Sequence, residues 1–294
     1  MQRRIESSTS RTAQMTCLSR ASSFMETNGY YKSDDFIAPL LLPGIFKVLL
    51  HFSLIRKIFS KIIGPKGIYE YVIVRTRYID AVFKQALEEQ FDQIVIFGAG
   101  FDTRALRFKN AIQKTRIFEL DAAITQQAKI HQYHKCHLSI PQKVSFVAID
   151  FDKETLSDKF DEAGFYKNQR SLFIMEGLLM YLQPESVNEL FQTIQNYAGK
   201  RSWIIFDYVY ASVIRNEGIY YGEDEIIKTV TVSGEQWHFG IEKGELGKFL
   251  DKYAFKVVNQ KDALQLEKTY FGTSDGTPIT RINGTHCLVI AEKI

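Results

Sequence analysis

Residues 93–108 read QIVIFGAGFDTRALRF, and this stretch decides the fold class of the chain. Residues 93–97 form a short apolar run, which is typical of a buried strand in a parallel sheet. Gly98 and Gly100 follow at once, where glycine lets the backbone turn sharply and lets a ligand come close. The pattern therefore predicts the first strand of an α/β sheet and a ligand-binding loop after it.

Further strands are expected downstream of this loop, separated by helical patterns such as 122–134 and 184–198. Alternation of this kind predicts an α/β fold, in which helices cover both faces of a mostly parallel sheet. The expected strands, the first included, are 93–97, 115–120, 144–149, 171–175, 202–207, 255–258 and 287–291.

The remaining segments are interpreted as additions to one domain. Residues 1–90 are expected to form a helical N-terminal cap, and 208–245 a lid insertion within the core of 91–207 and 246–294. Extra segments on an open α/β sheet tend to lie over the carboxyl edge of the strands, where ligands bind. Both segments are therefore predicted to roof the pocket, with simple packing elaboration as the alternative.

Composition narrows the functional classes. The chain has 294 residues and a net charge of +3, which is too small to favour a nucleic-acid partner. Three scattered cysteines and a polar first twenty residues favour a cytoplasmic location without a secretory signal. Charged residues interrupt the apolar segment 36–63, so we expect no membrane span but an amphipathic helix packed on the body, with a membrane-surface or lid role as the alternative.

The glycine loop lacks one feature of a dinucleotide site. The fingerprint GxGxxG needs a third glycine, and Thr103 occupies that position. Asp102 beside it would repel a pyrophosphate, so NAD and FAD are disfavoured.

Acidic residues follow the next three expected strands. Glu119 and Asp121 end the second strand, where a carboxylate can accept hydrogen bonds from ribose hydroxyls. Asp150, with Phe151 beside it, ends the third and can take an adenine amino group, and Glu176 ends the fourth. In this order the acids indicate an adenosine held without a diphosphate, which is the profile of S-adenosylmethionine.

The motifs IVIFGAGFDTRALRF, IFELD, VAIDFD and LFIMEGLLMYLQPESV, with SRTAQMTCLSRA and RTRYID upstream, resemble the leucine carboxyl methyltransferase family. The resemblance covers about residues 10–292 and is strongest to the bacterial O-methyltransferase branch linked to polyketide-type metabolism. It implies a Rossmann-like methyltransferase fold, a seven-stranded sheet with an antiparallel last strand, S-adenosylmethionine as methyl donor and no metal.

The resemblance also implies roles for single residues. Arg75 matches the arginine that grips the carboxylate of the cofactor, and Arg20 is a second basic candidate. Glu176 would lie near the sulfonium, and Tyr181 would face the acceptor. The remaining implied cofactor-binding residues are Gly98, Gly100, Asp102, Asp121 with Glu119 as its alternative, Asp150 and Phe151.

The methyl acceptor stays open between two oxygen chemistries. A carboxylate is already ionised and needs a cationic clamp, for which Arg104 or Arg215 is a candidate. A hydroxyl needs a general base, for which His238, Glu176 and Tyr181 are candidates. A small-molecule acceptor is expected. The alternatives are a protein C-terminus, a nicotinamide-dependent oxidoreductase, and a binding module without turnover, which the intact charged positions disfavour.

The stretch HQYHKCH at 131–137 is the one metal-like pattern. His131, His134 and His137 would share a helix face at spacings of three. The segment falls away from the expected carboxyl edge, and one short run cannot easily place four ligands around zinc. A surface cluster is therefore the favoured interpretation.

Overall fold

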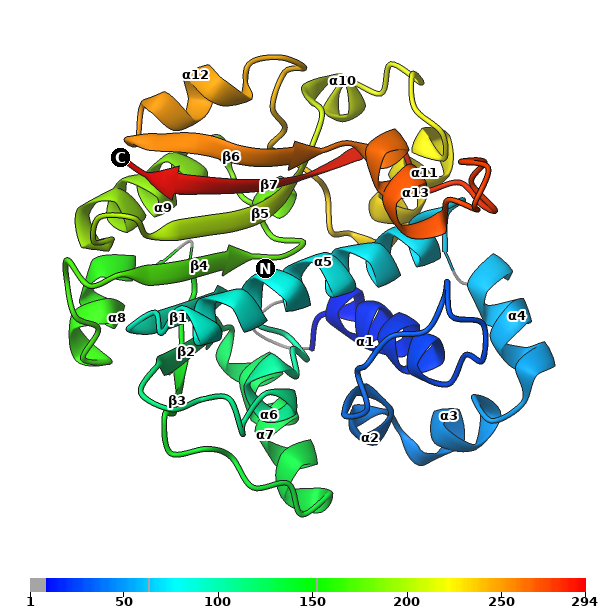
Figure 1. Cartoon of the computed structure of the whole chain (residues 1–294), viewed down its shortest axis with the longest axis horizontal. Coiled ribbons are helices and arrows are strands. Elements are labelled where there is room, and N and C mark those ends of the chain that lie inside the picture. Colours follow the sequence, from blue (N-terminus) through cyan, green and yellow to red (C-terminus); the bar gives the residue numbers. More distant parts are fainter. Residues whose placement is uncertain (1–8, 63, 152) are drawn as a thin grey trace.

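A seven-stranded sheet forms the centre of the computed structural model, which describes residues 9–62, 64–151 and 153–294 (Figure 1). The first five strands are parallel, and β7 runs antiparallel to both β5 and β6. The predicted α/β fold with an antiparallel last strand is confirmed. In spatial order the strands are β3 (Val144–Ala148), β2 (Arg116–Asp121), β1 (Gln93–Phe97), β4 (Ser171–Met175), β5 (Trp203–Val209), β7 (His286–Lys293) and β6 (Phe255–Lys261).

Side-chain alternation along the strands supplies both layers of the core. Ile94 and Ile96 face one side of the sheet, and Val95 and Phe97 face the other, because successive residues of a strand point to opposite faces. Helices cover each side (Figure 1). The first layer contains α5 (Ile68–Glu88), α7 (Ala123–Lys135) and α13 (Ala263–Phe271), and the second contains α8 (Leu156–Glu162), α9 (Pro184–Tyr197) and α12 (Leu246–Asp251).

Every predicted strand begins within one residue of an observed one. The largest difference is at the end of β6, which continues to Lys261 instead of stopping at Val258. β6 is an edge strand, and Asn259 and Gln260 are exposed. The last residues of β6 therefore lack the apolar side chains by which a strand is predicted from sequence. A register shift between Val257 and Asn259 interrupts the alternation further.

The N-terminal segment is broken into short helices. The segment 36–63, predicted to be amphipathic helix, is helical but divided into three helices, because Pro43 holds Leu42 in an extended conformation and ends the helix before it. Among the described residues, no helix has the length and the apolar composition needed to cross a membrane. The helices here are α1 (Arg11–Phe24), α2 (Ala38–Leu41), α3 (Gly44–Leu49) and α4 (Ser53–Ile62).

The segment after β5 leaves the sheet and returns to it. It contains α10 (Ala211–Ile214) and α11 (Glu223–Ser233), and a bridge between Tyr210 and Ile241 closes its base. Two shorter elements follow the central strands: α6 (Arg104–Arg107) after β1, and the 3-10 turn η2 (Leu179–Tyr181) after β4.

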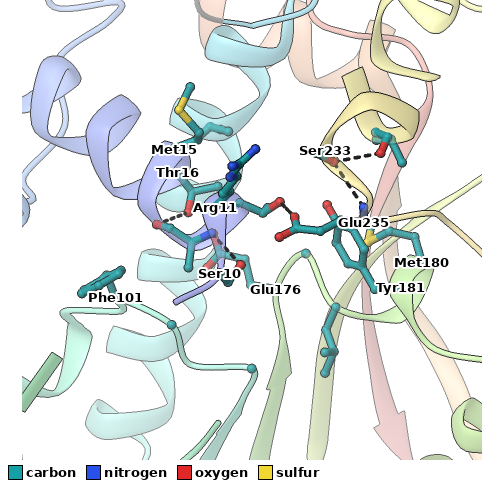
Figure 2. Close-up of a pocket in the computed structure, with 18 of the residues that line it drawn as sticks. Ser10, Arg11, Met15, Thr16, Phe101, Glu176, Met180, Tyr181, Ser233 and Glu235 are labelled. Carbon is teal, nitrogen blue, oxygen red and sulfur yellow. Dashed lines mark hydrogen bonds between the residues drawn. The ribbon is translucent and has the colours of Figure 1, made fainter. Parts of the chain in front are cut away.

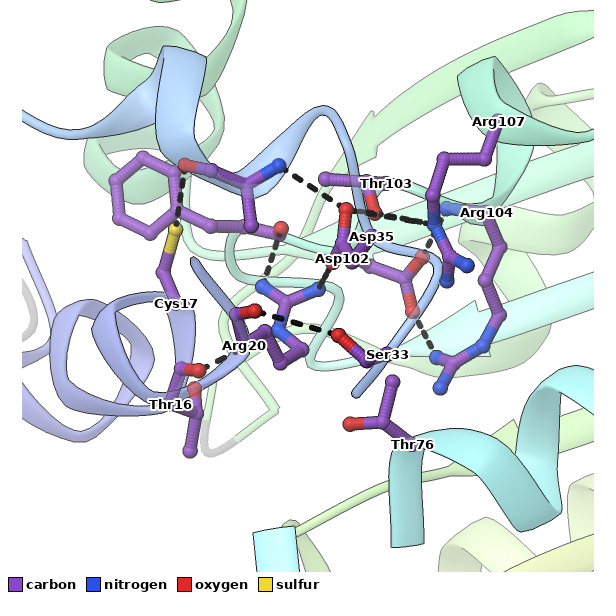
Figure 3. Close-up of polar contacts among 12 residues, drawn as sticks. Thr16, Cys17, Arg20, Ser33, Asp35, Thr76, Asp102, Thr103, Arg104 and Arg107 are labelled. Carbon is purple, nitrogen blue, oxygen red and sulfur yellow. Dashed lines mark hydrogen bonds and ion pairs between the residues drawn. The ribbon is translucent and has the colours of Figure 1, made fainter. Parts of the chain in front are cut away.

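Asp35 fastens the N-terminal helices to the sheet (Figure 3). Its carboxylate is fully buried and accepts hydrogen bonds from Arg20 on α1 at 2.9 Å, from Thr103 after the glycine loop at 2.7 Å, and from the backbone N–H of Ala38 at 3.0 Å. One side chain thus joins α1 and the segment after the glycine loop to the start of α2.

We expect Asp35→Ala to lower the free energy of unfolding by about 3–5 kcal/mol, because the substitution leaves the buried charge of Arg20 without its partner. Urea denaturation at pH 7 measures the change. Asp34→Ala is the matched control, since Asp34 is exposed, and it should change the value by less than about 0.5 kcal/mol. Equal effects of the two substitutions would contradict the anchoring role.

Candidate functional site

A cavity of about 870 Å³ lies at the carboxyl edge of the central strands (Figure 2). Its floor is made by the loops after β1, β2, β3 and β4. Figure 2 shows Arg11 and Thr16 of α1 on one side, and Ser233 of α11 with Glu235 on the other. The size suits a cofactor together with a small ligand.

Ten of the eleven predicted site residues line this cavity. They come from α1, α5 and four strand ends, so the converging carboxyl edges of parallel strands bring them together. The ten are Arg20, Arg75, Gly98, Gly100, Asp102, Asp121, Asp150, Phe151, Glu176 and Tyr181.

Glu119 is the exception, and its predicted place at the cofactor is wrong. Its side chain is fully buried and pairs with Lys129 of α7 at 2.5 Å. Glu119 lies two residues before the end of β2, about 7 Å inside the edge of the sheet. At that depth α7 covers the side chain, and burial raises the pKa of the Glu119 carboxyl to about 7.

The glycine loop needs its two glycines for space as well as for conformation. Gly98 and Gly100 have φ values of 57° and 46°. A Cβ on Gly98 would meet Leu178 at 3.2 Å, and one on Gly100 would meet Ala13 of α1 at 3.1 Å. The loop is therefore pressed between α1 and the segment after β4, and its backbone faces the cavity.

Asp121 orders the glycine loop from the end of β2. One of its carboxylate oxygens accepts the backbone N–H of Gly100, and the other accepts the N–H of Ala122 at 2.6 Å. Burial raises the pKa of Asp121. Each carboxylate oxygen can accept a second hydrogen bond, so a hydroxyl in the cavity can still bind here.

Arg75 reaches the cavity from α5 across two strand ends. Its Nε donates to Glu176 at 3.0 Å and its Nη1 to Asp207 at 2.7 Å. Burial would lower the pKa of Arg75, but Asp207 and Glu176 hold it above its ordinary value. Among the described residues, Nη2 has no hydrogen-bond partner, so one edge of the guanidinium is available to an anionic ligand group.

Arg20 and Asp102 are already engaged within the protein. Arg20 donates to Asp35 at 2.9 Å and to the carbonyl of Phe101 at 2.7 Å, so it holds the glycine loop. Asp102 pairs with the guanidinium of Arg104 and also accepts its backbone N–H at 2.7 Å. Burial alone would raise the pKa of Asp102, but Arg104 and more distant cations bring it down to about 2.

Glu176 and Tyr181 lie where the fourth strand meets the cavity. Both oxygens of Glu176 accept from arginines, Oε1 from Arg75 and Oε2 from Arg104 at 2.8 Å, so its side chain is fixed in orientation. Burial raises the pKa of Tyr181, which keeps its phenol protonated at neutral pH.

The other residues predicted to act on the methyl acceptor do not lie together. Arg104 is fully buried and lies outside the cavity lining, and Arg215 is exposed on α10's C-terminal side and paired with Glu242. Neither can clamp a ligand in this cavity, so both predictions are wrong. His238 does line the cavity, and the residue is exposed.

The histidine cluster lies on the surface. His131 and His134 are exposed on α7, and His137 follows the helix with a φ of 53°, so it does not continue their face. Across the described residues, no group of three or more acidic, histidine or cysteine side chains is placed to hold a metal ion.

Asp207 and His286 are among the polar residues at the site that the sequence analysis did not identify. Asp207 in β5 is fully buried and accepts from Arg75, from Tyr71 at 2.9 Å and from the N–H of Gly177 at 2.5 Å. An aspartate inside the apolar run IIFDYV was the available signal. His286, the first residue of β7, lines the cavity and carried no such signal.

Comparison with known proteins identifies the family. The model of the leucine carboxyl methyltransferase family matches residues 13–195. The chain belongs to this family. YktD of Bacillus subtilis, named as an S-adenosyl-L-methionine-dependent methyltransferase, is 28% identical over 219 residues, which is 69% of this chain and 72% of YktD. A protein of the same description from Mycobacteroides abscessus is 32% identical over 143 residues, 48% of this chain and 47% of that protein.

Solved structures agree on the fold. A protein from Thermobifida fusca YX described as a methyltransferase superposes with a TM-score of 0.60 at 11% identity, covering 98% of this chain and 97% of that one. A DUF574 family protein from Streptomyces avermitilis gives 0.58 at 10% identity, covering 99% and 100%.

These findings confirm the predicted family and cofactor. The protein is an S-adenosylmethionine-dependent methyltransferase of the leucine carboxyl methyltransferase family. The nicotinamide-dependent alternative is therefore withdrawn. The family match ends in α9, so β5, β6, β7 and the insertion lie beyond it.

His286 generates a pH prediction. Burial lowers its pKa from 6.5 to about 4, with Asp207 opposing the shift and Arg75 adding to it. Between these values the unfolded chain binds a proton that the folded chain does not, so stability falls as the pH falls. Between pH 7 and pH 5, the free energy of unfolding of the wild-type protein should fall by about 2 kcal/mol more than that of His286→Gln, as measured by urea denaturation. Parallel losses in the two proteins would contradict the assigned shift.

Proposed function

We propose that this methyltransferase moves the methyl group to an oxygen atom of a small, largely apolar molecule bound in the cavity. When bound, S-adenosylmethionine supplies an electrophilic methyl group on a sulfonium. The protein must then hold an acceptor oxygen in line with that carbon and exclude water. The observation that carries the proposal is that the cavity is roofed.

The roof joins the two segments added to the sheet. Thr12 of α1 donates a hydrogen bond to Glu235, which follows α11, and both line the cavity. Aromatic side chains such as Tyr71, Tyr181 and Trp237 form the walls beneath. A covered aromatic chamber suits a small molecule better than the end of a folded protein. We assign segment 208–245 as the lid on the same grounds.

The floor of the cavity suits the cofactor in both shape and charge. We assign Asp121 to the ribose hydroxyls, Asp150 and Phe151 to the adenine, and the open edge of Arg75 to the cofactor carboxylate. Around the glycine loop, four arginines face five carboxylates, which leaves a net negative charge that favours a positively charged ligand. The members are Arg20, Arg75, Arg104 and Arg107 with Asp35, Asp80, Asp102, Glu176 and Asp207.

One observation favours a carboxylate acceptor, which is the second candidate. Arg11 lines the cavity, its side chain is exposed, and it has no ion pair among the described residues. A guanidinium there could bind an acidic small molecule or a protein C-terminus.

Transfer of a labelled methyl group tests the proposal directly. Purified protein and methyl-labelled S-adenosylmethionine are incubated with a metabolite extract and, separately, with extracted protein. We expect label in the small-molecule fraction and none in protein. A base-stable product would be an ether and a base-labile one an ester. Label confined to protein would overturn the small-molecule assignment.

Asp121 and Glu119 form a matched pair for the cofactor assignment. We expect Asp121→Ala to weaken binding of S-adenosylhomocysteine by at least about tenfold, because it removes hydrogen bonds to the ribose and to the glycine loop. Glu119→Gln should stay within about threefold, since Glu119 faces Lys129 and lies outside the cavity lining. Isothermal titration calorimetry on folded protein measures both. The reverse order of effects would place the ribose at Glu119 after all.

A further inference from the structure

We propose that His286 is a catalytic residue whose Nε2 accepts the proton of a hydroxyl acceptor. The small molecule that is methylated here is then a phenol. This inference rests on the proposed oxygen methylation in the cavity and names its substrate class. It is carried by a chain of hydrogen bonds that assigns one tautomer to the ring.

The series of hydrogen bonds begins at Asn283, whose side-chain amide is oriented by backbone groups. Its Nδ2 donates to the carbonyl of Lys66 at 3.0 Å, and its Oδ1 accepts the N–H of Thr285 at 3.2 Å. A flipped amide would place donor against donor and acceptor against acceptor. Asn283 is fully buried, so Oδ1 is a fixed acceptor.

Thr285 determines which ring nitrogen of His286 carries the hydrogen. Its Oγ1 lies 2.5 Å from Oδ1 of Asn283 and 2.7 Å from Nδ1 of His286. The hydroxyl has one hydrogen, and Oδ1 can only accept, so Oγ1 donates to Asn283. Nδ1 of His286 must therefore carry a hydrogen and donate it to Oγ1. Nε2 is left with a lone pair.

The His286 ring lines the cavity and is packed between two aromatic rings. His286 stacks on Tyr71 at 4.4 Å between ring centroids, and the edge of Trp237 lies at 5.5 Å with an interplanar angle of 87°. Within the described parts of the chain, Nε2 has no hydrogen-bond partner. The protein thus presents one oriented acceptor between two aromatic rings, which matches an aromatic molecule with a hydroxyl donor.

The position in the sheet agrees with an acceptor role. His286 pairs with Val209 at the carboxyl end of β5, whereas the adenosine-side residues lie after β1, β2 and β3. Glu176, after β4, lies between the two groups in the strand order. The charged and titratable groups facing His286 are Asp207 on β5 and Arg75 and Tyr71 on α5.

The chemical step balances with His286 as the base. The acceptor O–H bond breaks, its proton goes to Nε2, and its electron pair stays on the oxygen. That oxygen forms the new bond to the methyl carbon while the carbon–sulfur bond breaks and leaves its electron pair on sulfur. The imidazolium then releases the proton to solvent. No oxidant, reductant or metal is needed.

Nitrogen NMR of the histidine side chains tests the proposal without turnover. The protein is saturated with S-adenosylhomocysteine at pH 7, and phenol is titrated against anisole, which has the same ring and no hydroxyl hydrogen. We expect His286 as the Nδ1–H tautomer with a bare Nε2. Phenol should shift Nε2 toward a hydrogen-bonded value, and anisole should leave it unmoved. Exposed His131 is the internal reference.

Thr285→Val is the paired variant, because it removes the oxygen that fixes Nδ1–H while keeping the side-chain shape. It should mix the two tautomers and abolish the selective response to phenol, and affinity for S-adenosylhomocysteine should stay within about threefold. A protonated Nε2 in wild type, equal responses to phenol and anisole, or an unchanged tautomer in the variant would overturn the role of His286. Failure to bind S-adenosylhomocysteine would instead count against the cofactor assignment, which separates the two proposals.

Discussion

The buried chain of charges from Arg104 through Glu176 and Arg75 to Asp207 is the interaction on which the site depends. It connects the helix after the glycine loop to the end of β4, then to α5, and finally to β5. Burying such charges is costly unless each is paired, so the members are mutually required. The network therefore keeps the ends of β1, β4 and β5 in a fixed relation, although no ligand is needed to do so.

That constraint explains why several acids at the edge of the sheet are unlike one another. Both oxygens of Glu176 accept from arginines, and Asp207 accepts from Arg75, from Tyr71 and from the N–H of Gly177. Asp121 bonds to backbone N–H groups instead, and it keeps acceptor capacity toward the cavity. In the proposed binding mode, the open edge of Arg75 and the free acceptor capacity of Asp121 would distinguish the two ends of an amino-acid-bearing nucleoside. The same side chains could not do this if they were free to rotate.

The sequence was sufficient to predict the sheet and to predict that most of the proposed cofactor residues meet at one edge of it. Strands such as Ser171–Met175 are short apolar runs with acids or glycines after them, and parallel strands bring their carboxyl ends to one edge. It was insufficient where depth within a strand decides the environment, as for Glu119. It also could not show that Arg104 and Arg20 are engaged inside the protein, because their partners Asp80 and Asp35 depend on tertiary packing.

The residues missed at the acceptor side have a common physical cause. Asp207 meets Arg75 across 132 positions, and the polarity of His286 depends on Asn283, whose own orientation is set by a carbonyl 217 positions away. Contacts between residues so far apart in the sequence produce no local pattern of apolar and polar residues. They also lie in β5, β7 and the preceding loop, outside residues 13–195, which the family model matches. In the described structure, the ion pairs of Arg75 with Glu176 and Asp207 connect these residues to the proposed cofactor side.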